Sequence, residues 1–217
     1  MKKNAKSIII ASMIISWNVT FTSCSNPIED ITHGLVYGIA DQLLDSKDQQ
    51  QQKENLQQER FNNLVNWNVG SEVDQEAVDK FGYDNCFRAT EVPSTIWDLT
   101  GTDGISPDIN SNDLCLVRCL NYSHAGNGYA PYIGGVICNK RIANDLVWIF
   151  RELYEAKFVV VQSGFTTMAQ EKGLAVVVNS DKTLTANDIA VRLFKERGFS
   201  WEGDKPDGDP YYFSKEQ

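Results

Sequence analysis

Histidine, the commonest metal ligand, is scarce in this chain of 217 residues. Only two histidines occur, His33 and His124, whereas a catalytic zinc site usually takes three protein ligands. Carboxylates or thiols would have to complete such a site, and a solvated loop residue is the simpler interpretation of His124. The turn from Asp204 to Asp209 offers oxygen ligands of the kind that hard cations prefer, but acidic turns are mostly solvated. We therefore expect no metal at either place.

The cysteines divide into an isolated one, Cys24, and four later ones: Cys86, Cys115, Cys119 and Cys138. Cys115 and Cys119 lie in one apolar run that reads as a strand. In a strand they would be about 13 Å apart, too far for a disulfide between them. The even number permits disulfides in an oxidising compartment without specifying the pairs. Buried free thiols are the other interpretation.

The N-terminal residues have the pattern of an export signal. Three lysines in the first six residues precede the apolar run 8–17, which is shorter than the roughly 20 residues of a membrane-spanning helix. Thr22 and Ser23 then precede Cys24, an arrangement similar to the lipoprotein processing box, in which the cysteine is acylated and becomes the new N-terminus. We predict a lipoprotein signal peptide over 1–23 and lipidation of Cys24. An ordinary cleaved signal and an uncleaved anchor are the alternatives.

The charge balance restricts the partners of the processed chain. Removing 1–23 takes away three basic and no acidic residues, so 17 basic residues face 29 acidic ones, a net charge of −12. Such a surface repels phosphate backbones and anionic head groups, so we expect no nucleic-acid partner and membrane attachment only through the lipid anchor. Ser25 after the cysteine, by the usual sorting convention, favours the outer membrane. We expect a cell-envelope protein that faces the periplasm or the cell surface.

Composition changes along the chain and suggests three segments after the signal. Residues 24–60 read as a tether with a polar, Gln-rich helix, because Gln, Glu and Lys favour helix but bury little. Residues 61–85 read as a helical adaptor that ends at Gly82. Residues 86–217 have the residue pattern that is typical of a packed α+β domain.

Periodicity predicts the elements of that domain. The runs 114–122 and 132–138 are apolar and β-branched, and the Gly-rich stretch 123–131 between them predicts a loop joining antiparallel strands. Asn139 is a cap for a helix that runs to about Lys157, and 158–161 reads as a strand. The continuous apolar run 173–179 predicts a buried, central strand. Thr185 and Asp188 resemble a capping box for a helix that stops at Gly198. The fold class is thus α+β, a small antiparallel sheet with packed helices.

Several stretches between Cys86 and Phe213 resemble the bacterial zinc peptidases that comprise D-alanyl-D-alanine carboxypeptidases and L-alanyl-D-glutamate endopeptidases. The stretches are Phe150-Arg-Glu-Leu-Tyr-Glu-Ala156, Gly173-Leu-Ala175 with Asn179, Gly198-Phe-Ser-Trp201, and Asp209-Pro-Tyr-Tyr-Phe213. The resemblance implies a peptidoglycan D,D-peptidase-like fold, a zinc cofactor and a peptidoglycan stem peptide as the substrate.

The zinc ligands of that family are missing from the matching positions. The family holds zinc with a Ser-x-His-x-x-Gly-x-Ala-x-Asp segment and with the histidine of Asp-x-x-His-Phe. In this sequence the two metal histidines fall on Gln170 and Tyr212, and the metal aspartate falls on Val177. Only the family's general base is kept, as Asp209.

The resemblance therefore implies a pseudoenzyme without a cofactor. It would bind a wall stem peptide or an envelope protein through a relict groove at Gln170, Tyr212 and Trp201. The alternative is an active metallopeptidase with a displaced metal site, since zinc activates water and polarises the scissile carbonyl and Asp209 alone does neither. A third interpretation is an interaction module that uses the polar helix 48–60 as its contact. Trp201 could instead pack structurally with Phe199 and Leu193.

Overall fold

The computed structural model describes residues 29–93, 111–125, 128–161, 167–168 and 174–216. The chain divides into two units, Met1–Gln49 and Gln50–Gln217, and helix α1 (Glu29–Val65) runs across the boundary. The hydrophobic core described below lies in the second unit. Among the helices that are described, none is both long enough and apolar enough to cross a membrane.

A four-stranded sheet in the order β1-β2-β3-β4 forms the centre of this unit. Its strands are β1 (Arg88–Thr90), β2 (Leu114–Ala125), β3 (Gly128–Asn139) and β4 (Thr167–Met168). All neighbours are antiparallel except β3 and β4. The mixed helices and small antiparallel sheets confirm the α+β prediction.

The β2–β3 hairpin is longer than the sequence pattern predicted. Pairing continues from Leu114 opposite Asn139 to Ala125 opposite Gly128, so the expected loop 123–131 is largely strand. The rings of Tyr122 and Tyr129 stack at 5.8 Å, and the ring of His124 lies 4.6 Å from that of Tyr129. Such cross-strand aromatic pairs stabilise strands whose composition is polar.

Helix α5 (Lys140–Glu155) follows β3 directly and confirms the predicted helix. The Asn139 side chain accepts a hydrogen bond from the Arg141 N–H at 3.0 Å and so caps it. Its buried face is regularly spaced: Ile142, Ala143, Leu146, Ile149, Phe150 and Leu153. This face packs mainly against β2. The predicted strand 158–161 is reduced to a single bridge between Tyr122 and Val159.

A second sheet has the order β5-β7-β6 and is antiparallel throughout. Its strands are β5 (Ala175–Val177), β6 (Ser200–Trp201) and β7 (Tyr212–Ser214), with the 3-10 turn η3 (Glu202–Asp204) after β6. The prediction of a central strand over 173–179 is wrong in this sheet, because β5 is its outer strand. Leu174, Val176 and Val178 are nonetheless buried. Burial alone therefore did not reveal the strand's place in the sheet.

Helix α6 (Ile189–Glu196) has Asp188 as its N-cap and Gly198, with φ +76°, just after its end. The predicted stop at Gly198 is confirmed. The capping box is only half formed. The Asp188 carboxylate accepts hydrogen bonds from the Thr185 N–H and from the Thr185 hydroxyl, both at 2.8 Å. No side chain, however, accepts a hydrogen bond from the first N–H groups of α6 itself.

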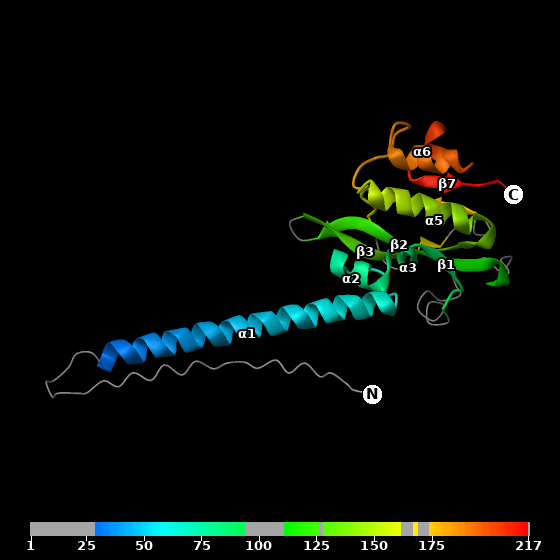
Figure 1. Cartoon of the computed structure of the whole chain (residues 1–217). Helices are drawn as coiled ribbons and strands as arrows, with labels where there is room; N and C mark the ends of the chain where they lie inside the picture. Colours follow the sequence, from blue (N-terminus) through cyan, green and yellow to red (C-terminus); the bar gives the residue numbers. More distant parts are fainter. Residues whose placement is uncertain (1–28, 94–110, 126–127, 162–166, 169–173, 217) are drawn as a thin grey trace, which may run out of the picture. The chain divides into compact units, whose positions relative to one another are not determined.

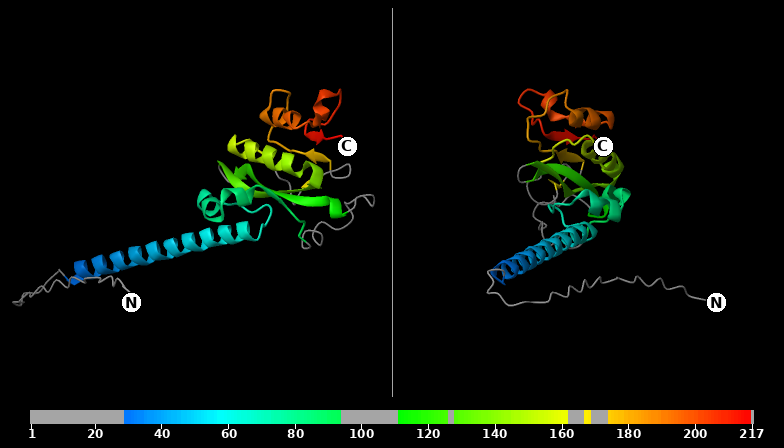
Figure 2. Two further views of the ribbon diagram at one scale, coloured as in Figure 1. Left: turned by 45° about the vertical axis from the view of Figure 1, so that its right-hand side comes forward. Right: turned by 60° about the vertical axis from the view of Figure 1, so that its left-hand side comes forward.

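Figures 1 and 2 show α5 between the four-stranded sheet on one side and the smaller sheet with α6 on the other. Helices α2 (Gln75–Phe81) and α3 (Tyr83–Cys86) precede β1, and a 3-10 turn, η2 (Ser111–Asp113), precedes β2. Leu64, Trp67, Val73 and Val78 belong to the same core as α5 and both sheets. Residues of the expected helical adaptor thus share one core with the C-terminal domain.

Candidate functional site

The small sheet brings together two of the positions at which the resemblance expects metal ligands. Val177 on β5 and Tyr212 on β7 are directly opposite each other in the antiparallel register. Both are half-buried and point to the same face as Ala175 and Ser214. Directly opposite residues have Cβ atoms about 4.5–5.5 Å apart. These two side chains are therefore neighbours, and neither is of a type that usually holds zinc.

The other face of this sheet belongs to the core. Val176 pairs with Phe213, and Phe213 pairs with Trp201. The Phe213 ring stacks on Phe194 of α6 with 4.1 Å between centroids. Alternation along β5 and β7 thus points one set of side chains into the core and leaves Val177 and Tyr212 on the opposite face.

Asp209, the position of the family's general base, is exposed at the start of the turn into β7. Its Oδ1 accepts a hydrogen bond from the Tyr211 N–H at 2.8 Å, and its carbonyl accepts one from the Tyr212 N–H at 3.2 Å. These bonds shape the backbone that carries Tyr212. In this structure Asp209 acts on local backbone geometry.

The remaining groove residues are placed differently from one another. Gln170 lies outside the described residues. Trp201 is 6% exposed, and its Nε1–H donates to the Pro210 carbonyl at 2.8 Å. Phe199 and Leu193 are buried with it. Tyr212 is therefore the one described groove residue with a partly exposed side chain.

No group of three or more His, Cys, Asp or Glu side chains that could hold a metal ion occurs in the part of the chain that the structure describes. His124 is on the hairpin, 57% exposed, with Nε2 4.0 Å from Asp181 Oδ2. In the acidic turn, Asp204 pairs with Lys195 at 2.7 Å and Glu202 pairs with Lys205 at 2.6 Å. These two carboxylates thus have lysine partners.

A groove of about 240 Å³ between α1 and α2 was not foreseen from the sequence. It is lined by polar and charged side chains around one aromatic ring and one alanine: Glu54, Gln57, Gln58 and Phe61 from α1, and Asp74, Glu76, Ala77 and Lys80 from around α2. The Lys80 ammonium lies 4.1 Å from the centre of the Phe61 ring. The groove thus combines carboxylates with one ammonium beside an aromatic ring.

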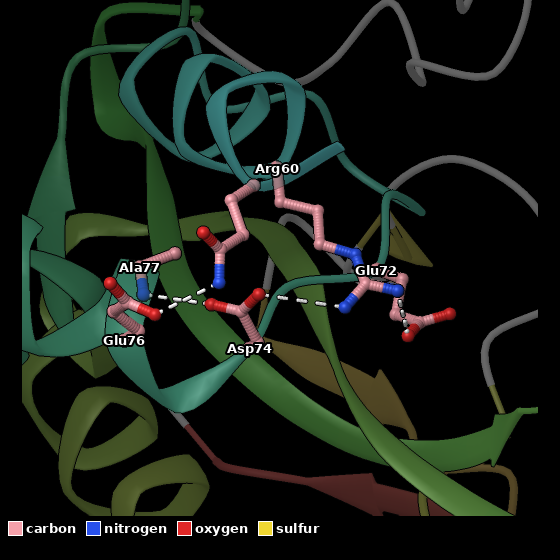
Figure 3. Close-up of polar contacts among 6 residues, drawn as sticks. Arg60, Glu72, Asp74, Glu76 and Ala77 are labelled. Carbon is pink, nitrogen blue, oxygen red and sulfur yellow. Dashed lines mark hydrogen bonds and ion pairs between the residues drawn. The ribbon is translucent and has the colours of Figure 1, made fainter. Parts of the chain in front are cut away.

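Ion pairs and hydrogen bonds hold the two helices beside this groove. Figure 3 shows Arg60 reaching from α1 toward the segment before α2, where its guanidinium lies 2.7 Å from Glu72 and 3.5 Å from Asp74. Asp74 also caps α2 by accepting from the Ala77 N–H at 2.8 Å. Gln57 Nε2 donates to Glu76 at 3.0 Å. The only sequence signal was the pair Phe61 and Leu64, apolar residues at helical spacing after a run that looked too polar to pack.

Comparison of the chain with known proteins found no relative. No family model, no curated protein and no solved structure matches this chain.

Proposed function

We propose that this chain is an exported, lipid-anchored envelope protein that binds its ligand without cleaving it. Its C-terminal domain would share the fold of the D-alanyl-D-alanine carboxypeptidase and L-alanyl-D-glutamate endopeptidase family. It would bind a peptidoglycan stem peptide or an envelope protein on the face of the small sheet that carries Tyr212. The observation that supports this proposal is the direct pairing of Val177 with Tyr212.

This pairing matters because the resemblance requires the two aligned ligand positions to lie close together in space. Zinc–nitrogen and zinc–oxygen bonds are about 2.0–2.2 Å long, so two ligands of one ion must come from adjacent positions. Val177 and Tyr212 were aligned with ligands on the basis of separate sequence motifs, and they are cross-strand neighbours. Two positions chosen arbitrarily in the domain would rarely be adjacent in this way.

The chemistry of the two side chains argues for binding over catalysis. Valine has no donor atom, and tyrosine is not among the side chains that usually hold zinc. Without the ion, no group there would lower the pKa of a water molecule toward 7 or polarise a carbonyl. A half-buried tyrosine ring beside a valine instead offers an apolar surface with one hydroxyl, a common combination in binding sites.

Zinc binding by a reconstructed site tests the resemblance. We expect the purified full chain to bind no stoichiometric zinc, and the triple variant Gln170→His, Val177→Asp, Tyr212→His to bind close to one equivalent. A ligand at 100 times its Kd adds about 2.7 kcal/mol to the stability of the native state, so the melting curve reports the gain. The matched control is Gln170→His, Val177→Leu, Tyr212→Phe, which lacks two of the three donors.

Two results would count against the proposal. A folded triple variant without zinc affinity would mean that the backbone does not follow the family. Near-equimolar zinc in the unmodified protein, lost in His124→Ala, would instead favour the alternative, an active metallopeptidase with a displaced site.

Co-sedimentation with insoluble peptidoglycan tests the ligand. We expect Tyr212→Ala to weaken binding while Tyr129→Ala, which removes an exposed tyrosine from the hairpin, leaves it unchanged. Loss of binding only in Glu54→Lys would move the site to the α1–α2 groove. Deleting 48–60 is unsuitable, since it would remove the Gln57 and Arg60 contacts of the domain itself. If none of the variants sediments less than the unmodified chain, the wall peptide is not the ligand of either surface.

A further inference from the structure

Two of the four cysteines in the described part of the chain face each other across the β2–β3 hairpin. Cys115 and Cys138 are directly opposite in the antiparallel register, and their Sγ atoms are 4.0 Å apart. Opposite residues in such a pair have Cα atoms about 4.5–5.5 Å apart, inside the range that a disulfide spans. Both thiols are free in the structure. The backbone therefore already holds the two sulfurs at a separation from which they can be joined.

A pocket of about 250 Å³ adjoins one of these thiols. It is lined by Cys115 together with residues of β1, the residue that follows it, and the first turn of α5, among them Thr90, Glu91, Lys140 and Ala143. Lys140 is anchored there because its Nζ donates to the Asn112 carbonyl at 2.6 Å. Cys138 is fully buried and does not line this pocket. A small molecule in the pocket would meet Cys115 first.

The surroundings give the four thiols unequal reactivity. The hydrogen bond with Cys138 lowers the pKa of Cys115, burial opposes this shift, and the charge of Lys140 adds to it. The same hydrogen bond and burial raise the pKa of Cys138. Burial raises the pKa of Cys86 to about 11 and also raises the pKa of Cys119. The thiolate is the nucleophile, and Cys115 is the thiol of this pair that lines the pocket, so Cys115 is the one placed to attack an entering molecule.

We propose that Cys115 and Cys138 form a reversible dithiol–disulfide site that reacts with a small-molecule disulfide entering beside Lys140. In the first step Cys115 Sγ bonds to one sulfur of the small disulfide. The S–S bond breaks, and the other half leaves as a thiol with the Cys115 proton. In the second step Cys138 Sγ attacks Cys115 Sγ, and the mixed disulfide breaks to release a second thiol with the Cys138 proton. Two protein thiols are oxidised and one small disulfide is reduced to two thiols.

The other two cysteines have different neighbours. The Cys119 thiol donates to Asn121 Oδ1 at 3.7 Å, and the Cys86 thiol donates to the Gly82 carbonyl at 3.6 Å. Cys119 lies opposite Gly134, so its cross-strand partner is no cysteine. These two residues are natural controls for the reaction.

The test uses the full chain, purified in detergent under reducing conditions and then treated with oxidised glutathione. After denaturation, alkylation should label Cys86 and Cys119 but leave Cys115 and Cys138 unlabelled. Trypsin cuts after Arg118 and after Lys140, which places Cys119 and Cys138 on one peptide. The same experiment in Cys119→Ser therefore assigns the bond without ambiguity, as a link between the Cys115 peptide and the Cys138 peptide.

Two further variants test the order of attack. Cys138→Ser should retain one glutathione on Cys115, because the resolving thiol is gone. Cys115→Ser should leave Cys138 reduced over the same time. Full labelling of Cys115 and Cys138 in the oxidised, unmodified chain would overturn the proposal, whatever the serine variants do. A disulfide that links Cys86 to another cysteine would also overturn it. The same holds if a folded Cys138→Ser protein carries glutathione on Cys86 and not on Cys115.

Discussion

At the scale of single residues, the surroundings of Trp201 decide between its two possible roles. The indole is almost fully buried, and its N–H is bonded to the Pro210 carbonyl. Gly203 lies against the ring so closely that an added Cβ would be 2.2 Å from it. The Lys195 ammonium lies 5.2 Å from the ring centre. A ring enclosed in this way contributes to folding more than to ligand contact.

Replacing Trp201 with alanine should therefore cost about 3–5 kcal/mol of unfolding free energy, because it leaves a large cavity in place of a buried ring. Trp201→Phe is the matched control, since it keeps an aromatic ring but leaves the Pro210 carbonyl without its donor, a loss of about 1–3 kcal/mol. Denaturant titration of both variants measures the two values. A loss below about 1 kcal/mol in Trp201→Ala would show that the ring is exposed in solution and is available to a ligand.

At the scale of elements, one carboxylate holds the loop that precedes α6. Asp188 pairs closely with Lys182 and accepts two hydrogen bonds from Thr185. The hydrogen bond from Lys182 is the main cause that lowers the pKa of Asp188, burial opposes it, and the Thr185 bonds add to it. The carboxylate thus orders the loop before α6 while it remains charged.

This arrangement predicts a pH dependence with a definite sign. Because the pKa of Asp188 is lower in the folded state than the ordinary value of about 3.9, its contribution is fully present above about pH 4. The contribution is lost as the pH falls through the folded-state pKa. Asp188→Asn should lower the unfolding free energy near neutral pH, and its difference from the unmodified chain should shrink on acidification. Denaturant titrations at several pH values measure this difference.

Asp207→Asn is the matched control for that experiment. Asp207 is exposed and has φ +61°, a conformation that asparagine also tolerates. We expect little change in stability from this substitution at any pH. A difference between Asp188→Asn and the unmodified chain that grows toward low pH would contradict the assigned role of the Asp188 carboxylate.

At the scale of the whole molecule, the proposed attachment to the membrane rests on Cys24. The processed chain that we propose is acidic and would not adsorb to anionic lipids. Cys24→Ser should therefore shift the protein from the membrane fraction to the soluble fraction of cells. Cys86→Ser is the control that should leave the distribution unchanged. If Cys24→Ser remains as membrane-bound as the unmodified protein, an uncleaved N-terminal anchor is the better interpretation.

Local signals in the sequence were sufficient for the elements that depend on local interactions. Asn139 and the apolar spacing after it predicted α5, and Gly198 predicted the stop after α6. Both signals act within a few residues, through a cap or a positive φ. The α+β class followed from combining such signals. The polar composition of residues 48–60, also a local signal, predicted that this segment buries little surface against the domain.

Tertiary structure decided which side chains lie next to each other. A symmetric loop over 123–131 would have paired Cys115 with Asn139, whereas the longer hairpin pairs Cys115 with Cys138. A one-residue slip in register turns side chains to the other face, so no local pattern could identify the dithiol. The contacts of Arg60 with Glu72 and of Val177 with Tyr212 likewise join segments whose pairing depends on the packing of the whole domain. The local signals determined the elements, and the packing of those elements determined the candidate sites.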